Sequence, residues 1–328
     1  MALARQLSRF QVKGTRAASS LSSLVSQHAA ATPERLALAA PQQGICWSFG
    51  ELNDRAKHAA SALAAHGCTG VLATDLPNSA ENLLLQVACS RLGVAVGTAK
   101  DSSALGELEK LGLKAAVTHR QAEPSLLEKH PLPLSPIVLE DLDGSLSPIL
   151  GSATPEAVSE KEADDTLPLG YWSSTKPLTN GEAIGVMGSA ARDRLGITAD
   201  DRVLVSITLC HAFGIGSAVG GAWLAGAAVV LPGASGIRGC GSPSQRAEAT
   251  LSSLISQRCS LLFADVHTLK ALPAPQPGMD LAALRGGVCK VGSGADFLED
   301  VTEAKIGPDG ELRPLEYAGV RLLALGKK

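Results

Sequence analysis

The sequence predicts an α/β fold in which helices cover a mostly parallel sheet. Short apolar strands alternate along the chain with helical segments, which is the pattern of parallel β-α-β units. Hydrophobic residues make up 45% of the 328 residues and aromatic residues only 3%, while glycine occurs 34 times. Small aliphatic side chains pack well in such a core, and the many glycines allow the turns between its elements. The length allows one large domain or two smaller ones.

Residues 1–20 have the composition of a mitochondrial presequence. No Asp or Glu occurs before residue 34, and basic side chains recur among Ser and Ala. On a helical wheel the basic residues lie opposite the apolar ones, as in an amphipathic targeting helix. The basic residues are Arg5, Arg9, Lys13 and Arg16, and the apolar ones are Leu3, Leu7 and Phe10. We therefore expect a mitochondrial location, with processing between Arg16 and Leu24; the alternative is an untargeted basic tail.

Residues 21–167 are expected to form a first α/β subdomain. Ser48-x-x-Glu51 is a capping box that begins a helix, and Gly67 and Gly93 each end one. The expected helices are 22–31, 49–65, 80–92, 102–111 and 125–130, and the expected strands are 45–49, 71–75, 94–96 and 115–118. Residues 131–167, rich in Pro, Ser, Gly and acidic side chains, are expected to be a linker or surface excursion.

Residues 168–300 are expected to form a second α/β subdomain. Its expected helices are 181–195 and 244–257, and its expected strands are 202–207, 261–264 and 284–291. The last of these is the final clear sheet element, and residues 301–328 are expected to be a short C-terminal β/turn segment. Paired acids at Asp200 and Asp201 fall in turn-like sequence and are expected to be solvated.

Residues 213–231 resemble a membrane span because they contain 19 residues without charge. The alternative is a buried helix of small residues followed by a strand at 227–231, which Pro232 ends. Six glycines, a β-branched end and the lack of a cationic flank favour the buried helix and strand. We therefore expect no membrane span.

Charge and cysteine content exclude other classes of protein. The 29 basic and 32 acidic residues give a net charge of −3, so there is no general basic field for nucleic acid. The seven cysteines are scattered without a Cys-x-x-Cys pair, which indicates reduced thiols in a non-secretory compartment. No zinc-ligand spacing or dinucleotide glycine motif is present.

Several segments in the correct order resemble the N-terminal domain of the adenylate-forming superfamily, in its acyl-CoA synthetase branch. These segments are residues 32–38 with 47–52, residues 76–81 with 88–93, residues 195–204 with 210–214 and 225–227, and residues 284–294. The resemblance implies two mostly parallel sheets covered by helices. It also implies ATP-dependent activation of a carboxylate as an acyl-adenylate and transfer of the acyl group to coenzyme A.

The phosphate-binding loop of that family is degraded in this sequence. The family form, Tyr-Thr-Ser-Gly-Thr-Thr-Gly-x-Pro-Lys-Gly, uses glycines because their backbone can approach a phosphate closely. The matching stretch contains Ser173, Ser174, Thr175 and Lys176, but no glycine between Tyr171 and Gly181. With Gly292, Ser293 and Gly294, which resemble the loop lining the adenine pocket, these residues form a degenerate nucleotide site. ATP or AMP and Mg²⁺ are expected as cofactors only if this site works.

Two other parts of the catalytic machinery are not found. The Tyr-Gly-x-Thr-Glu motif, whose Glu holds the metal ion in this family, does not follow residue 298, where an internal deletion would bring residues 303–311 close. The C-terminal domain with its catalytic lysine is not found before Lys328, so Lys327 and Lys328 are interpreted as a terminal basic pair. We predict no catalytic residue and no metal ligand.

An acyl pocket is the remaining candidate site. The resemblance places His211 beside the acyl channel, with Phe213 and Gly214 bordering a fatty-acyl-sized pocket; a core histidine bonded to backbone is the alternative. Cys210 is discounted as a nucleophile paired with His211, since neighbours on a strand point to opposite faces. Asp265 and His267 are expected to be a helix cap and a surface side chain, with polar lining of the nucleotide pocket as the alternative.

Three functions remain open. The first is a mitochondrial, catalytically degenerate acyl-CoA synthetase-like protein that binds a ligand or protein partners as a component of a larger complex. The second is a working ATP-dependent acyl-CoA ligase that activates a fatty or other carboxylic acid. The third is a truncated sequence whose catalytic remainder lies beyond residue 328.

Overall fold

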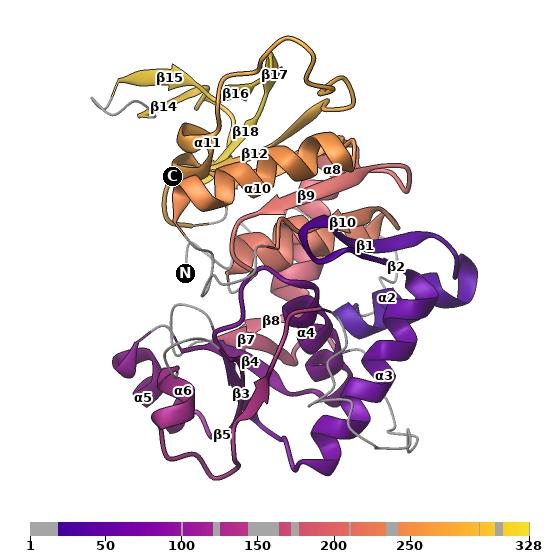
Figure 1. The fold of residues 1–328 in the computed structure, drawn as a ribbon, viewed down its shortest axis with the longest axis vertical. Coiled ribbons are helices and arrows are strands. Elements are labelled where there is room, and N and C mark those ends of the chain that lie inside the picture. Colours follow the sequence, from indigo (N-terminus) through magenta and orange to yellow (C-terminus); the bar gives the residue numbers. More distant parts are fainter. Residues whose placement is uncertain are drawn as a thin grey trace, which may run out of the picture.

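A computed structural model gives the fold of residues 19–99, 101–120, 125–143, 164–171, 177–209, 211–233, 242–294, 296–305 and 311–327. Two mostly parallel sheets and the helices around them form the molecule, with the smaller sheet in the lower half of Figure 1 and the larger in the upper half. The predicted α/β class and the two parallel sheets are confirmed.

The smaller sheet has six strands in the order β6-β5-β3-β4-β7-β8. All neighbours are parallel except β7 and β8, which form a hairpin. Its strands are β3 (Val71–Thr74), β4 (Ala95–Thr98), β5 (Leu113–His119), β6 (Ile137–Leu139), β7 (Pro168–Tyr171) and β8 (Leu178–Thr179).

The larger sheet has eight strands in the order β13-β18-β12-β11-β9-β10-β1-β2. Only the edge strands β2 and β13 pair antiparallel with their neighbours. Its strands are β1 (Leu36–Ala40), β2 (Ile45–Ser48), β9 (Arg202–Ser206), β10 (Ala228–Val230), β11 (Leu261–Asp265), β12 (Gly286–Lys290), β13 (Asp296–Leu298) and β18 (Leu323–Gly326). Two small hairpins stand beside it, β14 (Glu303–Lys305) with β15 (Leu312–Pro314) and β16 (Glu316–Tyr317) with β17 (Val320–Arg321).

Seven of the described α-helices, α2 to α6, α10 and α11, begin at a Ser or Asp that caps the first turn. Ser48 accepts a hydrogen bond from the Glu51 backbone N–H and Glu51 accepts one in return, so the predicted capping box is confirmed. The α-helices are α2 (Leu21–Ala31), α3 (Phe49–Ala65), α4 (Ala80–Leu92), α5 (Ser102–Lys110), α6 (Leu126–Lys129), α8 (Ser189–Leu195), α9 (Gly221–Leu224), α10 (Pro243–Ser256) and α11 (Val266–Ala271). A 3₁₀ turn, η2, covers Pro41–Gln43, and the π-helical segments η3 (Gly181–Gly188) and η4 (Phe213–Gly220) lead into α8 and α9.

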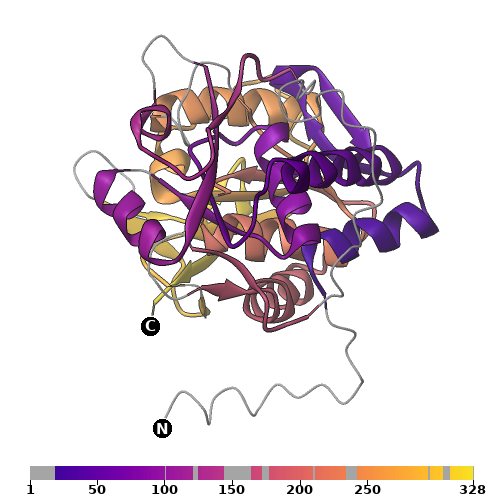
Figure 2. The same cartoon turned by 90° about the horizontal axis from the view of Figure 1, so that it is seen from below.

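The boundary expected at residue 167 does not separate the two sheets. Strands β1 and β2 come from the first segment but lie in the larger sheet, whereas β7 and β8 come from the second segment and complete the smaller one. In Figure 2 the indigo segments, α2 and the β1–β2 ribbon, lie at the same side of the molecule. One hydrophobic core contains strand residues of both sheets, among them Leu72, Val96, Val203 and Val229.

Two expectations about irregular regions are wrong. Residues 137–139 of the expected linker form β6, which pairs with β5. The strand at residues 286–290 is not the last sheet element either, because β18 lies between β12 and β13 inside the larger sheet. Both errors have one cause: a strand of three or four residues carries little periodic signal, and its partner is remote in sequence.

The apolar stretch of residues 213–231 forms η4, α9 and β10, as the buried alternative predicts. Phe213 and every residue of η4 are buried, and the strand β10 pairs with β9 and β1. Within the part of the chain that the structure describes, no helix is both long and apolar enough to cross a bilayer.

The five cysteines in the described residues are free: Cys46, Cys68, Cys89, Cys259 and Cys289. Burial raises the pKa of Cys68 to about 11 and the pKa of Cys259 to about 12. These thiols therefore stay protonated at neutral pH, which makes them poor nucleophiles.

Candidate functional site

A cavity of about 710 Å³ opens at the carboxyl ends of three neighbouring strands, β9, β11 and β12. Because these strands are parallel, the segments that follow them meet at one edge of the sheet, where α/β proteins place their ligand sites. The cavity is lined by Ile207, Thr208, His211, Asp265, Val266, His267, Lys290, Val291, Gly292, Val301, Glu303 and Ala304.

His211 lies between β9 and η4 and contacts Lys290 across the cavity wall. The backbone N–H of Phe213 donates to Nδ1 of the imidazole at 3.1 Å. The Lys290 Nζ atom lies 2.8 Å from Nε2 and 3.2 Å from Nδ1 of the same ring, so it sits beside the ring between the two nitrogens. A residue after β9 and the last residue of β12, 79 positions apart in the sequence, therefore form one polar pair.

The position of His211 depends on the tight turn that precedes η4. A Cβ atom at Gly214 would overlap the carbonyl oxygen of Thr208, so this position requires glycine for close backbone approach. The sequence predicted Gly214 to border the pocket. In the structure it instead allows the close turn that positions His211.

The pKa values of His211 and Lys290 are both lowered in this cavity. Burial, together with the positive charge of Lys290, lowers the pKa of His211 to about 4. Burial also lowers the pKa of Lys290, although the negative charge of Asp265 opposes that shift. The cavity therefore contains an imidazole that is neutral at pH 7 beside a lysine whose ammonium form is less favoured than in water.

Asp265 and His267 fit both alternatives predicted from the sequence. Asp265 caps a helix and His267 is exposed, and both side chains also line the cavity. The Asp265 carboxylate caps α11 by accepting a hydrogen bond from the Thr268 backbone N–H at 2.6 Å. It also lies 3.3 Å from the Arg246 guanidinium. Asp265 is thus a cap that also contributes negative charge to the site.

The other predicted site residues are distributed unevenly around the cavity. Gly292 lines it, but Ser293 and Gly294 are exposed and are not among its described lining residues. Phe213 and Gly214 are fully buried behind the wall, where the Phe213 ring packs on Phe263 with ring centroids 5.6 Å apart. Ser173, Ser174, Thr175 and Lys176, and also Cys210, lie outside the described residues.

Lys290 is the functional candidate that the sequence reasoning missed. The run Gly286–Lys290 ends a buried strand on a charged residue, and the rule that sites gather at the carboxyl ends of parallel strands was available to find it. A lysine at the end of a strand is usually solvated, so its position alone does not indicate a functional site. Glu303 was missed because β14 folds back over the cavity from the β/turn segment after residue 300, whose place in the fold the sequence does not indicate.

The expectation that Asp200 and Asp201 are both solvated is wrong for one of them. The Asp200 side chain is 92% exposed, whereas that of Asp201 is 6% exposed. The Arg285 guanidinium donates to both carboxylate oxygens of Asp201 at 3.0 and 2.7 Å. Burial raises the pKa of Asp201, but hydrogen bonds from Arg285, Thr198 and Ser260 outweigh it and bring the net pKa below its usual value. Asp201 is therefore structural and lies outside the cavity.

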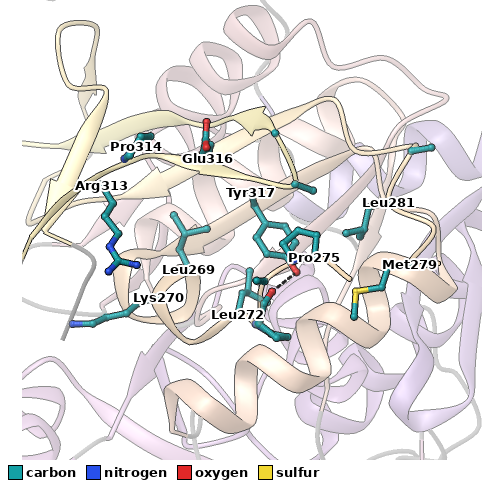
Figure 3. Close-up of a pocket in the computed structure, with 15 residues that line it drawn as sticks. Leu269, Lys270, Leu272, Pro275, Met279, Leu281, Arg313, Pro314, Glu316 and Tyr317 are labelled. Carbon is teal, nitrogen blue, oxygen red and sulfur yellow. Dashed lines mark hydrogen bonds between the residues drawn. The ribbon is translucent and has the colours of Figure 1, made fainter. Parts of the chain in front are cut away.

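A second cavity, of about 910 Å³, lies between α11, the loop that follows it and the β15–β17 region. Figure 3 shows Lys270 and Arg313 at one end of this cavity and a cluster of apolar side chains at the other. The Tyr317 hydroxyl donates to the Pro273 carbonyl oxygen at 3.0 Å and closes the gap between the two walls. No group of three potential metal ligands occurs in either cavity or elsewhere among the described residues.

The two-sheet fold is similar to that of the N-terminal part of acyl- and aryl-CoA ligases. An anthranilate CoA ligase, AuaEII, superposes with a TM-score of 0.68 at 18% identity, over 84% of this chain and 55% of that one. The N-terminal domain of FACL13 from Mycobacterium tuberculosis gives a TM-score of 0.66 at 16% identity, over 90% of this chain and 86% of that domain. O-succinylbenzoate coenzyme A synthetase from Bacillus subtilis gives 0.63 at 24% identity, over 84% and 55%.

The sequence matches the model of the AMP-binding enzyme family over residues 25–239, which is more than half of the chain. The chain belongs to this family, and the predicted resemblance is confirmed. It spans about half the length of the anthranilate CoA ligase. No curated protein matches it by sequence.

Proposed function

We propose that this protein is a mitochondrial, catalytically degenerate member of the AMP-binding family that acts as a binding or structural component of a larger complex. The observation that carries the proposal is the composition of the segment between β7 and η3. No glycine occurs between Tyr171 and Gly181, although the family loop uses several to surround the phosphates.

The hairpin of β7 and β8 limits what this segment can do. Gly170 pairs with Leu178, so only residues 171–177 connect the two paired positions. Pro177 in this connection has no backbone N–H to donate to a phosphate. A short connection without glycine is a poor cradle for a triphosphate, which needs several backbone N–H groups to point at one centre.

Calorimetry on the full chain tests the loss of nucleotide chemistry. We expect no heat of binding with Mg²⁺–ATP or a non-hydrolysable acyl-AMP analogue, and no acid-dependent release of pyrophosphate with short, medium or long fatty acids. A competent acyl-CoA ligase measured in parallel is the positive control, and a cooperative thermal transition shows that the chain is folded. ATP binding with acid-dependent pyrophosphate release would overturn the proposal in favour of a working acyl-CoA ligase.

The mitochondrial part of the proposal is supported by the composition of residues 1–20, and the fold limits where processing can occur. Ser20 caps α2, and Leu21 is fully buried, so processing beyond Leu21 would remove a core side chain. We therefore narrow the expected processing to between Arg16 and Ser20. A fluorescent fusion to residues 1–20 should enter mitochondria, and the variant with Arg5, Arg9, Lys13 and Arg16 all changed to Gln should not. Equal distribution of both fusions would contradict this.

Membership of a larger complex follows from the proposed loss of catalysis, and two exposed apolar side chains are its candidate contact points. Leu312 on β15 is 63% exposed and Val186 on η3 is 53% exposed, whereas such side chains are usually buried. Native gel electrophoresis of mitochondrial extract should show the protein well above the 33.5 kDa mass of its chain. Migration as a monomer would contradict the proposal.

A further inference from the structure

The second cavity has positive charge at one end and apolar side chains at the other (Figure 3). Lys270, in the last turn of α11, and Arg313, on β15, lie at the charged end. Met279 and Leu281 lie at the apolar end. Among the described residues, this cavity shares no lining side chain with the first cavity, which contains His211. A ligand that fills the second cavity must therefore carry negative charge at one end and be apolar along the rest.

The walls of this cavity are already in place without a ligand. Leu269 and Leu272 on one wall and Tyr317 on the other are buried. The Tyr317 hydroxyl donates to the Pro273 carbonyl oxygen, so its polar atom has a partner and its ring is left to contact a ligand. The hairpin that carries Tyr317 is closed by a two-residue turn, Ala318–Gly319, with positive φ at both positions. The volume of about 910 Å³ is that of a small-molecule site.

The charged end offers two cationic groups that are not firmly engaged elsewhere. Lys270 forms no ion pair with any residue that the structure describes. Arg313 lies 3.7 Å from Glu311, which is too far for a hydrogen bond, and both side chains are more than half exposed, so this contact is weak. The Glu316 carboxylate points away from both cations in Figure 3, because Glu316 and Tyr317 are neighbours on a strand and face opposite sides.

We propose that the second cavity binds a single-chain lipid phosphate, which is an alkyl or acyl chain that ends in a phosphate monoester. Such a head group carries nearly two negative charges at neutral pH, which matches one ammonium and one guanidinium better than the single charge of a carboxylate does. A guanidinium binds two phosphate oxygens at once, and a lysine binds phosphate as a point charge. The chain extends past Tyr317 toward Met279 and Leu281. This inference goes beyond the proposed function and does not depend on it.

Calorimetry on the full chain with dodecyl phosphate, below its micelle concentration and without nucleotide, tests the proposal. We expect one molecule to bind per chain and inorganic phosphate to give no heat of binding. Dodecanoate and dodecyltrimethylammonium, which differ in head group alone, should bind at least about tenfold more weakly. Decyl phosphate should also bind more than about tenfold more weakly, because each of its two missing CH₂ groups contributes about fourfold.

Variants test the two ends of the cavity separately. Lys270→Gln and Arg313→Gln should each weaken binding of dodecyl phosphate about tenfold, which is the size of one charge-assisted hydrogen bond. Arg321→Gln is the matched control, because Arg321 is exposed on β17 and does not line the cavity; it should leave binding unchanged. Met279→Glu places a charge at the apolar end and should abolish binding. A cooperative thermal transition of each variant shows that it is folded.

Lysine acetylation with peptide mapping locates the bound molecule. Dodecyl phosphate should protect Lys270 from acetic anhydride. It should not protect Lys290 in the first cavity or Lys114, an exposed residue of β5. Protection of Lys290 in place of Lys270 would mean that the molecule binds in the first cavity and would overturn the proposal.

Two results of the calorimetry would also overturn it. The first is equal affinity of wild type, Lys270→Gln and Arg313→Gln for dodecyl phosphate. The second is binding of dodecanoate as tight as that of dodecyl phosphate, since the phosphate head would then have no role. Because these measurements contain no ATP, neither result bears on the proposed loss of nucleotide chemistry.

Discussion

The side-chain amide of Asn78 holds the backbone of the segment from Val205 to Leu209. Its Nδ2 group donates to the carbonyl oxygens of Val205 and Ile207 at 3.3 and 2.5 Å, and its Oδ1 atom accepts from the Leu209 N–H at 2.9 Å. Asn78 follows β3 of the smaller sheet, whereas residues 205–209 leave β9 of the larger one. One buried amide thus joins the two halves of the fold and fixes the segment that leads to His211.

Removing this amide should destabilise the whole molecule. Asn78→Ala leaves two carbonyl oxygens and one N–H of a buried loop without their partner, so we expect a loss of about 2–3 kcal/mol in the free energy of unfolding. Urea unfolding measures it. Gln42→Ala removes an exposed side-chain hydrogen bond to Ser252 and should cost less than about 0.5 kcal/mol. Similar stabilities for the two variants would show that the Asn78 contacts contribute nothing.

Adjacent acidic residues should behave very differently when neutralised. Asp201→Asn breaks the bidentate contact with Arg285, and we expect it to cost about 2 kcal/mol, because charge-assisted hydrogen bonds in a buried site are among the stronger ones. Asp200→Asn changes a carboxylate that is 92% exposed and should change stability by less than about 0.5 kcal/mol. Equal effects would mean that burial of Asp201 has no energetic role.

The pH dependence of Asp201 follows from the sign of its shift. Its folded pKa lies below its usual value of 3.8, so its stabilising contribution is present above pH 3.8 and is lost as the pH falls through the folded pKa. The gap in unfolding free energy between wild type and Asp201→Asn should therefore narrow in acid. A gap that stays constant down to about pH 2 would contradict this.

Local sequence signals predict the helices better than the strands that close the sheets. The Ser48–Glu51 capping box and the glycine after α4 act within one turn, so residues 48–51 and Gly93 reveal them directly. Strand β1, Leu-Ala-Leu-Ala-Ala, has residues that favour helices. It is a strand because it pairs with β10 and β2, one of which is nearly 200 residues away. Its conformation is decided by tertiary contacts that a sequence window does not contain.

The candidate site was predictable only on the side that resembles the family. His211 and Gly292 belong to matched segments and do line the cavity. Lys290 lies within the matched segment 284–294, but the resemblance does not single it out; it enters the cavity because β12 ends there, and Glu303 enters because β14 returns over it. The topology, rather than the spacing of residues, brings the Lys290 amine to the imidazole.

His211 should remain neutral well below the usual titration range of histidine. Its pKa of about 4, against the ordinary 6.5, means that between these values the unfolded chain takes up a proton that the native protein does not. Stability should therefore fall as the pH drops from 6.5 toward 4. Other titratable groups that line the same cavity are Lys290, Asp265, His267 and Glu303.

Comparison of wild type with His211→Gln isolates this contribution. Unfolding free energies near pH 7 and near pH 5 should differ more in wild type than in the variant. The NMR signal of the His211 ring, followed with pH, gives the native pKa directly. A ring that titrates at about 6.5, with parallel pH dependence of the two proteins, would contradict the burial and charge that lower the pKa.

Replacing glycine by alanine should destabilise the protein at Gly214 and stabilise it at Gly106. At Gly214 a Cβ atom would overlap the backbone oxygen of Thr208, which belongs to a segment held by Asn78 and cannot move freely. We expect Gly214→Ala to cost about 2–3 kcal/mol, as overpacking against fixed atoms does. The same change should also displace the side chain of His211, which lies three residues before Gly214.

At Gly106, inside α5, no atom lies within 4 Å of the added Cβ. Gly106→Ala should stabilise the protein by about 0.5–1 kcal/mol, because alanine loses less backbone entropy than glycine in a helix. Thermal unfolding of both variants measures whether each is more or less stable than wild type. An unchanged stability of Gly214→Ala would show that the turn carrying His211 can relax.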